Sequence, residues 1–365
     1  MMKQRILHGD YVLTPFPSVR DFMVEVGVSY LTARKVMKVL LDEHLISHAP
    51  NGRFVVTRGQ EEGEQPLHIV FLEHAPSSDP DSMAVDKRWI NAIENAAVGF
   101  NCRIRHVLYK HWNDPTIIES IEQFDGIFVI PLPEEMPESI VTRFREKQRV
   151  VVIDGDLTHA GIPSIMPFPA EMGQSLLNHL ASLGHTRIDC LNVQPLCLAI
   201  PEYIQQWRLW MSLHQHLGYT GKLINEPVVV GSSPYDQAFQ VMDHVLSTGS
   251  FDATALFCTT AAGAIGAMHA FRLYGIQVGK DVAVCTINGT EMASYFCPTI
   301  TAFNMFNIDA CFRLCLQRMT EPEWNWDGAL SMQPIDPVLH IRESTVPESL
   351  IIRKDTAKTG SPIPL

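Results

Sequence analysis

From Leu67 onward, short apolar runs alternate with longer amphipathic stretches. The apolar runs, which predict strands, cover residues 67–72, 102–109, 126–131, 149–154, 187–193, 226–231, 253–259 and 281–288. The amphipathic stretches, which predict helices, cover residues 85–99, 116–123, 138–147, 171–183, 201–217, 235–247 and 261–274. Near-continuous Val/Ile runs are typical of strands buried on both faces, and the regular alternation indicates βαβ units. The pattern therefore predicts an α/β fold with two doubly wound parallel sheets that face one another as lobes.

The first sixty residues follow a different pattern. Ser18 can cap a helix that ends at Gly27, and Ser29 can cap a second helix with apolar positions at i, i+3 and i+4. Two short extended runs around Asn51-Gly52 predict a β-hairpin. A helix, a glycine-containing turn, a second helix and a hairpin together predict a winged helix-turn-helix. The alternative is a small helical subdomain whose basic residues are merely solvated.

Charge also separates this head from the rest of the chain. Residues 1–59 carry eight Lys/Arg and five Asp/Glu, a net +3, whereas the remainder carries −15 within the total of −12. We therefore expect only the head to meet a polyanion. No apolar run reaches the roughly 20 residues of a membrane span, and the start lacks the apolar core of a signal peptide. These features predict a cytoplasmic protein.

Motifs for catalysis and metal binding are missing from the sequence. The eight cysteines form no CxxC pair, which predicts reduced, buried thiols, with Cys311 and Cys315 packed on one helix. No HExxH, GxGxxG or GxxxxGK[ST] motif occurs, and no nucleophile–base pair or carboxylate dyad is evident. We therefore expect no enzyme activity, no metal and no cofactor.

The head resembles the GntR family of bacterial transcription regulators in the stretch "FPSVRDFMVEVGVSYLTARKVMKVLLDEHLISHAPNGRFV". The resemblance implies that the second helix lines the major groove and that the wing approaches the sugar edge. Tyr30 stands where the family usually has Arg, and Leu31 stands where a small polar residue is common. The expected DNA-contacting residues are Ser18, Arg20, Ser29, Tyr30, Thr32, Arg34, Lys35, Asn51, Gly52 and Arg53.

The acidic body resembles the effector domain of LacI-type repressors, which is built like periplasmic sugar-binding proteins. Residues 173–191, 253–289 and 292–306 carry the resemblance. It implies a small-molecule effector between two lobes, a sugar or related metabolite, and a homodimer. Three of the four charged groups that hold sugars in the family are replaced here. The corresponding residues are Gln206 with Arg208 nearby, Thr260, Asn288 and the one retained aspartate, Asp154.

Further candidates come from the residues themselves. His74 follows the first strand, at the edge where ligands meet parallel sheets, although a structural donor is the alternative. Tyr235, Trp207 and Trp210 can stack on a ligand ring or pack in the core. The expected effector-binding residues are His74, Asp154, Gln206, Arg208, Tyr235, Thr260 and Asn288.

These features predict a sequence-specific DNA-binding transcriptional regulator, a repressor, controlled by a small molecule. The expected segments are a DNA-binding domain (1–58), a linker (59–66), a two-lobed effector-binding and dimerisation domain (67–345) and a tail (346–365). Double-stranded operator DNA is the expected macromolecular partner. One alternative is an effector-independent DNA-binding dimer with a degenerate pocket. Another is a ligand-binding α/β protein that does not bind DNA.

Overall fold

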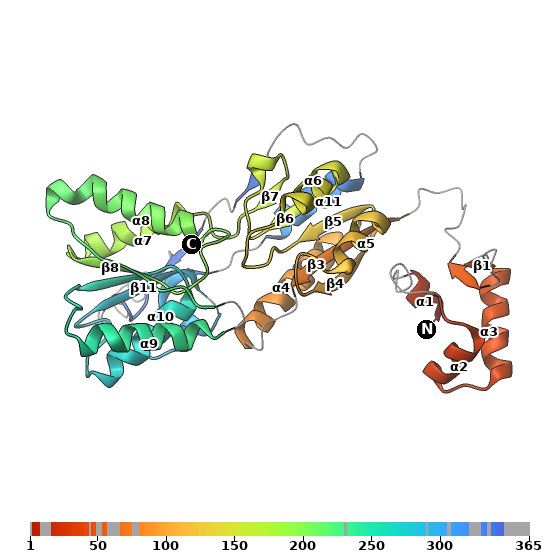
Figure 1. The fold of residues 1–365 in the computed structure, drawn as a ribbon, viewed down its shortest axis with the longest axis horizontal. Helices are drawn as coiled ribbons and strands as arrows, with labels where there is room; N and C mark the ends of the chain where they lie inside the picture. The colour runs from red at the N-terminus through yellow and green to blue at the C-terminus, as the bar shows by residue number, and fades with distance from the viewer. Residues whose placement is uncertain are drawn as a thin grey trace, which may run out of the picture.

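The protein comprises a small head and two larger α/β lobes (Figure 1). The structure is a computed structural model. It describes residues 2–7, 16–43, 45–48, 53–56, 66–74, 80–229, 232–289, 291–304, 308–320, 330–333 and 337–346. The expected tail beyond Val346 and all of the expected linker except Pro66 lie outside these residues. No helix within the described ranges is long and apolar enough to cross a membrane.

In the part of the head that the structure describes, there are three helices and a two-stranded antiparallel sheet. Its elements are α1 (Met2–Leu7), α2 (Val19–Val26), α3 (Tyr30–Asp42), β1 (Ile46–His48) and β2 (Phe54–Val56). A cluster of buried apolar side chains drawn from the head alone forms its core: Ile6, Phe16, Phe22, Ala33, Met37, Leu40 and Ile46. The predicted helix-turn-helix and strand pair are therefore present.

The first lobe, lobe 1, is a parallel six-stranded sheet in the order β13-β7-β6-β5-β3-β4. Its strands are β3 (Leu67–His74), β4 (Cys102–Tyr109), β5 (Gly126–Val129), β6 (Val150–Ile153), β7 (Ser164–Ile165) and β13 (Ser331–Met332). Side chains of α5 (Pro115–Gln123) and α6 (Glu138–Lys147) pack on one face, and those of α4 (Pro80–Ala97) and α11 (Asp309–Thr320) pack on the other. Helices on both faces explain why these strands are almost continuously apolar.

The second lobe, lobe 2, repeats this plan with the order β14-β12-β11-β10-β8-β9. Its strands are β8 (Ile188–Asn192), β9 (Leu223–Asn225), β10 (Ala255–Cys258), β11 (Ala283–Gly289), β12 (Thr301–Asn304) and β14 (Leu339–His340), of which only β14 is antiparallel to its neighbour. Helices α7 (Met172–Ser182) and α8 (Ile200–His214) pack on one face, and α9 (Pro234–Ser247) and α10 (Ala261–Leu273) pack on the other. Short 3₁₀ helices occur at Thr158–Ala160, Gln215–Leu217 and Glu291–Ser294.

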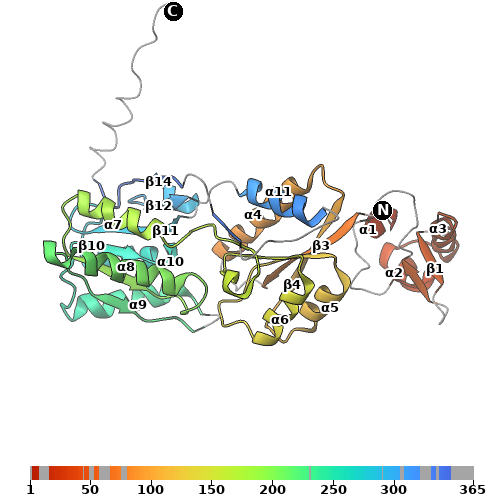
Figure 2. The ribbon, with the colours of Figure 1, turned by 90° about the horizontal axis from the view of Figure 1, so that it is seen from above.

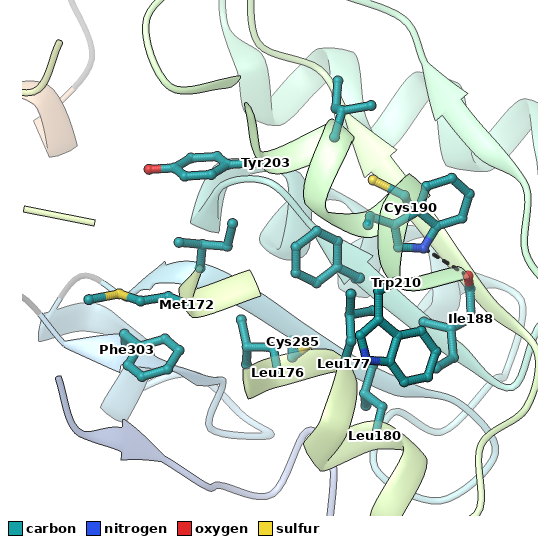
Figure 3. Packing of buried hydrophobic residues seen from close by; sticks show 14 of the residues in the cluster. Met172, Leu176, Leu177, Leu180, Ile188, Cys190, Tyr203, Trp210, Cys285 and Phe303 are labelled. Atoms are coloured by element: carbon teal, nitrogen blue, oxygen red, sulfur yellow. Dashed lines mark hydrogen bonds between the residues drawn. The ribbon is translucent and has the colours of Figure 1, made fainter. Parts of the chain in front are cut away.

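The core of lobe 2 under α7 and α8 is densely apolar (Figure 3). Met172, Leu176 and Leu180 of α7 face the sheet residues Cys190 and Cys285. Trp207 donates its indole N–H to the Ile188 carbonyl at 3.2 Å, and Trp210 donates to Asn178 Oδ1 at 2.8 Å. Both tryptophans are therefore core residues, not ring-stacking candidates.

The chain crosses between the lobes three times. The segment after β7 leads to α7, the segment after β12 leads back to α11, and the segment after β13 leads to β14. As a result, α11 completes lobe 1 although it follows almost all of lobe 2 in the sequence (Figure 2). The predicted fold class, two parallel-sheet lobes with an N-terminal helix-turn-helix, is confirmed.

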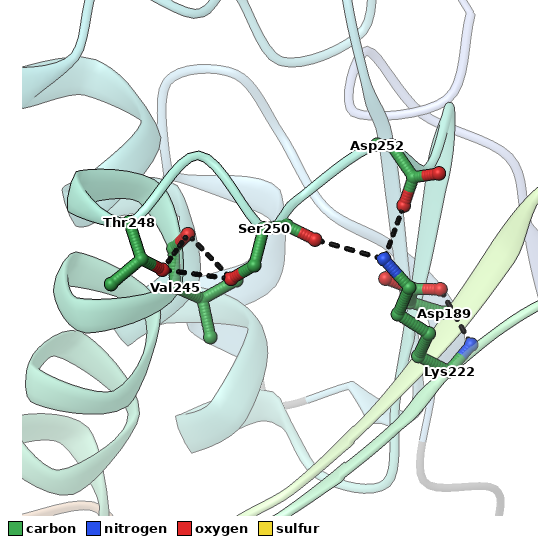
Figure 4. A network of polar contacts seen from close by, with 6 residues as sticks. All are labelled: Asp189, Lys222, Val245, Thr248, Ser250 and Asp252. Carbon is green, nitrogen blue, oxygen red and sulfur yellow. Dashed lines mark hydrogen bonds and ion pairs between the residues drawn. The ribbon is translucent and has the colours of Figure 1, made fainter.

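A polar network supports lobe 2 near the amino-terminal edge of its sheet (Figure 4). Asp189 of β8 accepts a hydrogen bond from the Lys222 backbone N–H at 2.7 Å. The Lys222 ammonium contacts Asp252 at 2.6 Å and the Ser250 carbonyl at 2.9 Å. Burial raises the pKa of the Asp189 carboxyl. These contacts join β8, the approach to β9 and the loop before β10.

Two expectations need correction. The strand predicted at residues 226–231 lies earlier, at Leu223–Asn225, although the Glu226 and Val228 N–H groups still donate to the Asn192 and Val193 carbonyls beside β8. The cysteines are free, but they are not all buried. Four are buried, three are partly buried and Cys297 is exposed. Cys315 is buried and Cys311 packs at the edge of the same cluster, as expected for residues on one helix.

Candidate nucleic-acid interface and inter-lobe site

Two serine caps fix the helix pair of the head. Ser18 forms a capping box with Asp21: the Asp21 N–H donates to Ser18 Oγ at 3.3 Å, and the Ser18 N–H donates to Asp21 Oδ2 at 3.2 Å. The Ser18 hydroxyl and the Ser18 N–H both donate to the Asp21 carboxylate, and these two hydrogen bonds lower its pKa. Gly27 ends α2 in the left-handed conformation at φ 69°, where glycine is favoured. Ser29 then accepts a hydrogen bond from the Thr32 N–H at 3.2 Å and starts α3.

Basic side chains lie on the exposed face of α3. Its buried face consists of Ala33, Met37 and Leu40. Arg34, Lys35 and Lys38 are exposed on the opposite side. Arg20 on α2 and Arg53 beside β2 are exposed too. This face is therefore suited to a polyanion such as the DNA backbone.

The hydroxyls of Ser18, Ser29 and Thr32 serve the fold of the head. Ser18 Oγ donates to Asp21 Oδ2 at 2.7 Å, and the Ser29 and Thr32 hydroxyls lie 2.8 Å apart. All three side chains remain at the surface. These hydroxyls therefore already stabilise the helix starts. Any contact with DNA, as expected from the sequence, would be a second role.

The hairpin follows α3 directly. Ile46 pairs with Val56, and His48 pairs with Phe54 across the antiparallel strands. The rings of His48 and Phe54 stand 4.7 Å apart between centroids. Asn51 and Gly52, the predicted turn residues, lie outside the described residues. This arrangement matches the predicted wing.

In lobe 1, acidic and histidine side chains lie at and near the carboxyl ends of the strands. Glu73 on β3 is buried, and its Oε2 lies 2.5 Å from His106 Nε2 on β4. Its other oxygen, Oε1, is buried and has no hydrogen-bond partner among the described residues. His74 follows on β3 and is partly buried. The Glu73–His106 pair was not anticipated from the sequence.

Asp154 directly follows β6 and has unusual geometry. Its φ of 59° lies in the left-handed region, which aspartate tolerates better than most residues. No side-chain hydrogen bond reaches its carboxylate from the described part of the chain. Desolvation raises the pKa of Asp154 to about 7. An aspartate held in this way can exchange a proton near neutral pH or accept hydrogen bonds from a bound molecule.

The residues around Asp154 meet lobe 2. A Cβ added to Gly155 would lie 3.4 Å from Leu198 Cδ2, so the two lobes touch at this point. Tyr203, at the start of α8, donates its hydroxyl to the Phe168 carbonyl at 2.7 Å. Burial raises the pKa of Tyr203, and the negative charge of Asp154 raises it further. Asp154 therefore lies near the junction of the lobes.

In lobe 2, uncharged polar groups occupy the carboxyl ends of the strands. Asn192 ends β8 and donates to Asn225 Oδ1 at 2.8 Å, while its own Oδ1 accepts from Thr259 at 2.8 Å. Gln194 reaches Thr260 Oγ1 at 3.4 Å. Asn288 accepts a hydrogen bond from the Ala261 N–H at 2.9 Å, at the start of α10. These amides and hydroxyls form a neutral edge of the lobe 2 sheet.

The structure separates the predicted effector residues into distinct groups. Asp154 lies at the junction, and Thr260 and Asn288 belong to the neutral edge of lobe 2. Gln206 pairs with Gln174 of α7 at 2.5 Å, in the angle between α7 and α8. The remaining predicted effector residues are His74 on β3 of lobe 1, the exposed Arg208 on α8 and the partly buried Tyr235 on α9. The sequence reasoning missed Asn192, Gln194 and Leu198, whose only signal is their position at or after the carboxyl end of a buried strand.

The fold defines a class: an α/β protein with two parallel-sheet lobes that resemble the periplasmic-binding-protein-like domain, preceded by a helix-turn-helix. Residues 177–345 match the family described as Periplasmic binding protein-like domain. The chain is 25% identical over 221 residues to the HTH-type transcriptional repressor PurR of Vibrio vulnificus, covering 59% of this chain and 64% of that protein. It is 28% identical over 234 residues to PurR of Vibrio parahaemolyticus, covering 62% of this chain and 67% of that protein.

The solved structures agree on the fold. A lac repressor dimer bound to operator and the anti-inducer ONPF superposes with a TM-score of 0.60 at 16% identity, covering 78% of this chain and 96% of that chain. The match is to a LacI-type repressor, and the two curated relatives are PurR repressors. The resemblance of the head to GntR-type regulators therefore gains no support from these proteins.

Proposed function

We propose that this protein is a DNA-binding transcriptional repressor whose affinity for operator DNA is set by a small molecule bound between its two lobes. One observation carries the proposal: the same chain contains a capped helix pair with a basic outer face and two lobes with polar side chains at their junction. In this proposal residues 1–58 bind DNA, and residues 67–345 bind the effector and dimerise. The relatives named PurR are HTH-type repressors, which supports the same role here.

The DNA-binding part follows from the surface of the head. Recognition helices read base edges with their amino-terminal residues, and the exposed start of α3 is followed by Arg34, Lys35 and Lys38. The hairpin β1-β2 then acts as a wing against the backbone. A homodimer would place two heads on half-sites about 10 base pairs apart, or a multiple of that distance.

The effector part follows from the junction. The edge of lobe 2 offers amide and hydroxyl groups without charge, and lobe 1 offers the Asp154 carboxylate. Such a site favours an uncharged ligand that both donates and accepts hydrogen bonds, as a sugar or a related metabolite does. Ligand binding would favour one relative placement of the lobes, and thus change operator affinity, only if its affinity differs between the two placements.

A fluorescence-anisotropy titration of the full chain with duplex DNA tests the first part. Affinity should fall steeply as salt rises, because phosphate contacts release counterions. Arg34→Ala should weaken binding to a selected operator by about 1–3 kcal/mol if Arg34 reads a base. Arg272→Ala makes the same change at an exposed site in lobe 2 and should leave binding unchanged. Absence of any salt-dependent duplex binding would refute the proposal.

A second candidate is a repressor that needs no effector. The observation in its favour is that Gln206, Thr260 and Asn288 each already accept a hydrogen bond from another group of the protein. Titration calorimetry with a panel of neutral sugars, uronates and nucleobases separates the two candidates. Micromolar binding of any compound in the panel eliminates the effector-independent repressor. If no compound binds while operator binding is intact, the effector-independent repressor is favoured.

A further inference from the structure

Leu31 is an exposed leucine at the amino-terminal turn of α3. Its side chain is 70% exposed, although leucine is usually buried. At 3.6 residues per turn, position 31 lies on the same side of α3 as positions 34, 35 and 38, and opposite Ala33, Met37 and Leu40. Leu31 therefore contributes nothing to the core of the head. It stands one turn before Arg34 and Lys35 on the basic face.

The surroundings of Leu31 exclude a local packing role and direct it outward. The Ser29 and Thr32 hydroxyls on either side bond to one another at 2.8 Å and hold the helix start in place. Tyr30, the preceding residue, is 48% exposed. An exposed apolar side chain next to exposed cations suits the major groove, where phosphates flank an apolar group.

The only apolar group that base edges present in the major groove is the C5 methyl of thymine. We infer that Leu31 contacts a thymine methyl group and so determines sequence preference at one position of each half-site. This inference rests on the proposed DNA-binding function. Arg34 and Lys35 would contact a neighbouring base or the phosphates, and Leu31 would distinguish A·T from G·C at the adjacent step.

Uracil substitution tests the contact directly, because uracil differs from thymine only by lacking this methyl. The full-length protein is first used to select binding sites from a random duplex library, in parallel with Leu31→Ala. Each thymine of the wild-type site is then replaced by uracil in turn. Removing the contacted methyl should weaken wild-type binding about fourfold, the equivalent of one buried methyl group. The Leu31→Ala variant should bind the thymine and uracil duplexes equally.

Val39→Ala is the matched control, because Val39 is also an exposed aliphatic residue of α3 but lies about 12 Å further along the helix. It should keep the fourfold preference for thymine. Circular dichroism should show that both variants fold, since truncating an exposed side chain barely affects stability.

The possible outcomes distinguish the role of Leu31 from DNA binding itself. If the wild type tolerates uracil at every thymine of its site, or if Leu31→Ala keeps the same loss, the role of Leu31 is refuted while DNA binding stands. If no duplex is bound at low ionic strength, the DNA-binding function fails and the inference fails with it.

Discussion

At the scale of single residues, Asp154 combines a left-handed backbone with a carboxylate that no described side chain neutralises. Its pKa in the folded protein is about 7, against an ordinary value of 3.8. The folded state therefore binds more protons than the unfolded state between these values. The stabilisation that results is complete below about pH 4 and is lost as the pH rises through 7.

Asp154→Asn should therefore stabilise the protein at pH 8, because it removes a desolvated charge while keeping a residue that tolerates positive φ. We expect a gain of roughly 1–3 kcal/mol, less than the full pKa shift implies because the residue is only partly buried. Urea unfolding at pH 8 and at pH 4.5 measures it, and the gain should shrink at the lower pH.

The control for this substitution is Asp252→Asn. Asp252 lies in an exposed ion pair with Lys222, so its neutralisation should change stability little. A stability of Asp154→Asn that is equal to the wild type at both pH values would show that the Asp154 carboxylate is well solvated.

The candidate site could be predicted only in part at this scale. The caps Ser18 and Ser29 follow from residue type and position, because a serine before an apolar helical repeat has few other uses. The ties of Gln206 to Gln174 and of Asn288 to the start of α10 could not be predicted. They depend on which helices and strands become neighbours, and a single sequence does not show that pairing.

At the scale of elements, the contact between α9 and α10 depends on one glycine. A Cβ on Gly266 of α10 would lie 2.5 Å from the Tyr235 carbonyl oxygen and 2.6 Å from Ala238 Cβ. Gly266→Ala should therefore destabilise lobe 2 by about 2–3 kcal/mol, because the helices must separate. Gly263→Ala on the same helix meets only ordinary contacts, the nearest at 3.7 Å.

Gly263→Ala should stabilise the lobe by about 0.5–1 kcal/mol through helix propensity. Denaturant unfolding of the two variants compares them directly. Equal stability of both would mean that α9 and α10 are not packed as closely as the structure places them.

The head offers a second test at this scale. Ser29→Ala removes the hydroxyl that accepts the Thr32 N–H and should destabilise the head by about 1 kcal/mol. Ser212→Ala, at an exposed position inside α8, should not affect the head. Hydrogen exchange of the α3 amides measures the difference. Unchanged protection of α3 in Ser29→Ala would show that the cap is not important for the helix start.

Elements with strong periodicity were predicted well from the sequence. The bounds of β4 and α6 match the structure, and most other helices and strands differ by a few residues. The strands β7, β12, β13 and β14 were missed. Three of them have only two residues, too few to show any period, and β12 has four. The places of β13 and β14 in their sheets come from chain crossings that local pattern cannot reveal.

At the scale of the whole molecule, the head and the lobes have separate cores. The head cluster contains no residue of either lobe, and the four lobe clusters contain no residue of the head. We expect the free energy of unfolding of the small head to be lower than that of the lobes. Ser29→Ala should then shift only the unfolding of the head, and Gly266→Ala only that of the lobes.

Differential scanning calorimetry of the full chain, read together with hydrogen exchange, tests this separation. A single transition that moves as a unit in both variants would show that the two parts are thermodynamically coupled.

The three chain crossings have a consequence for synthesis on the ribosome. The side chains of Phe312, Leu316 and Met319 pack against β3 and β5, yet they are translated more than 180 residues later. Until they emerge, one face of the first sheet has an incomplete covering, whereas the head needs only its own short sequence to fold. A nascent chain would thus complete its helix-turn-helix head well before the sheet of lobe 1 is covered on both faces.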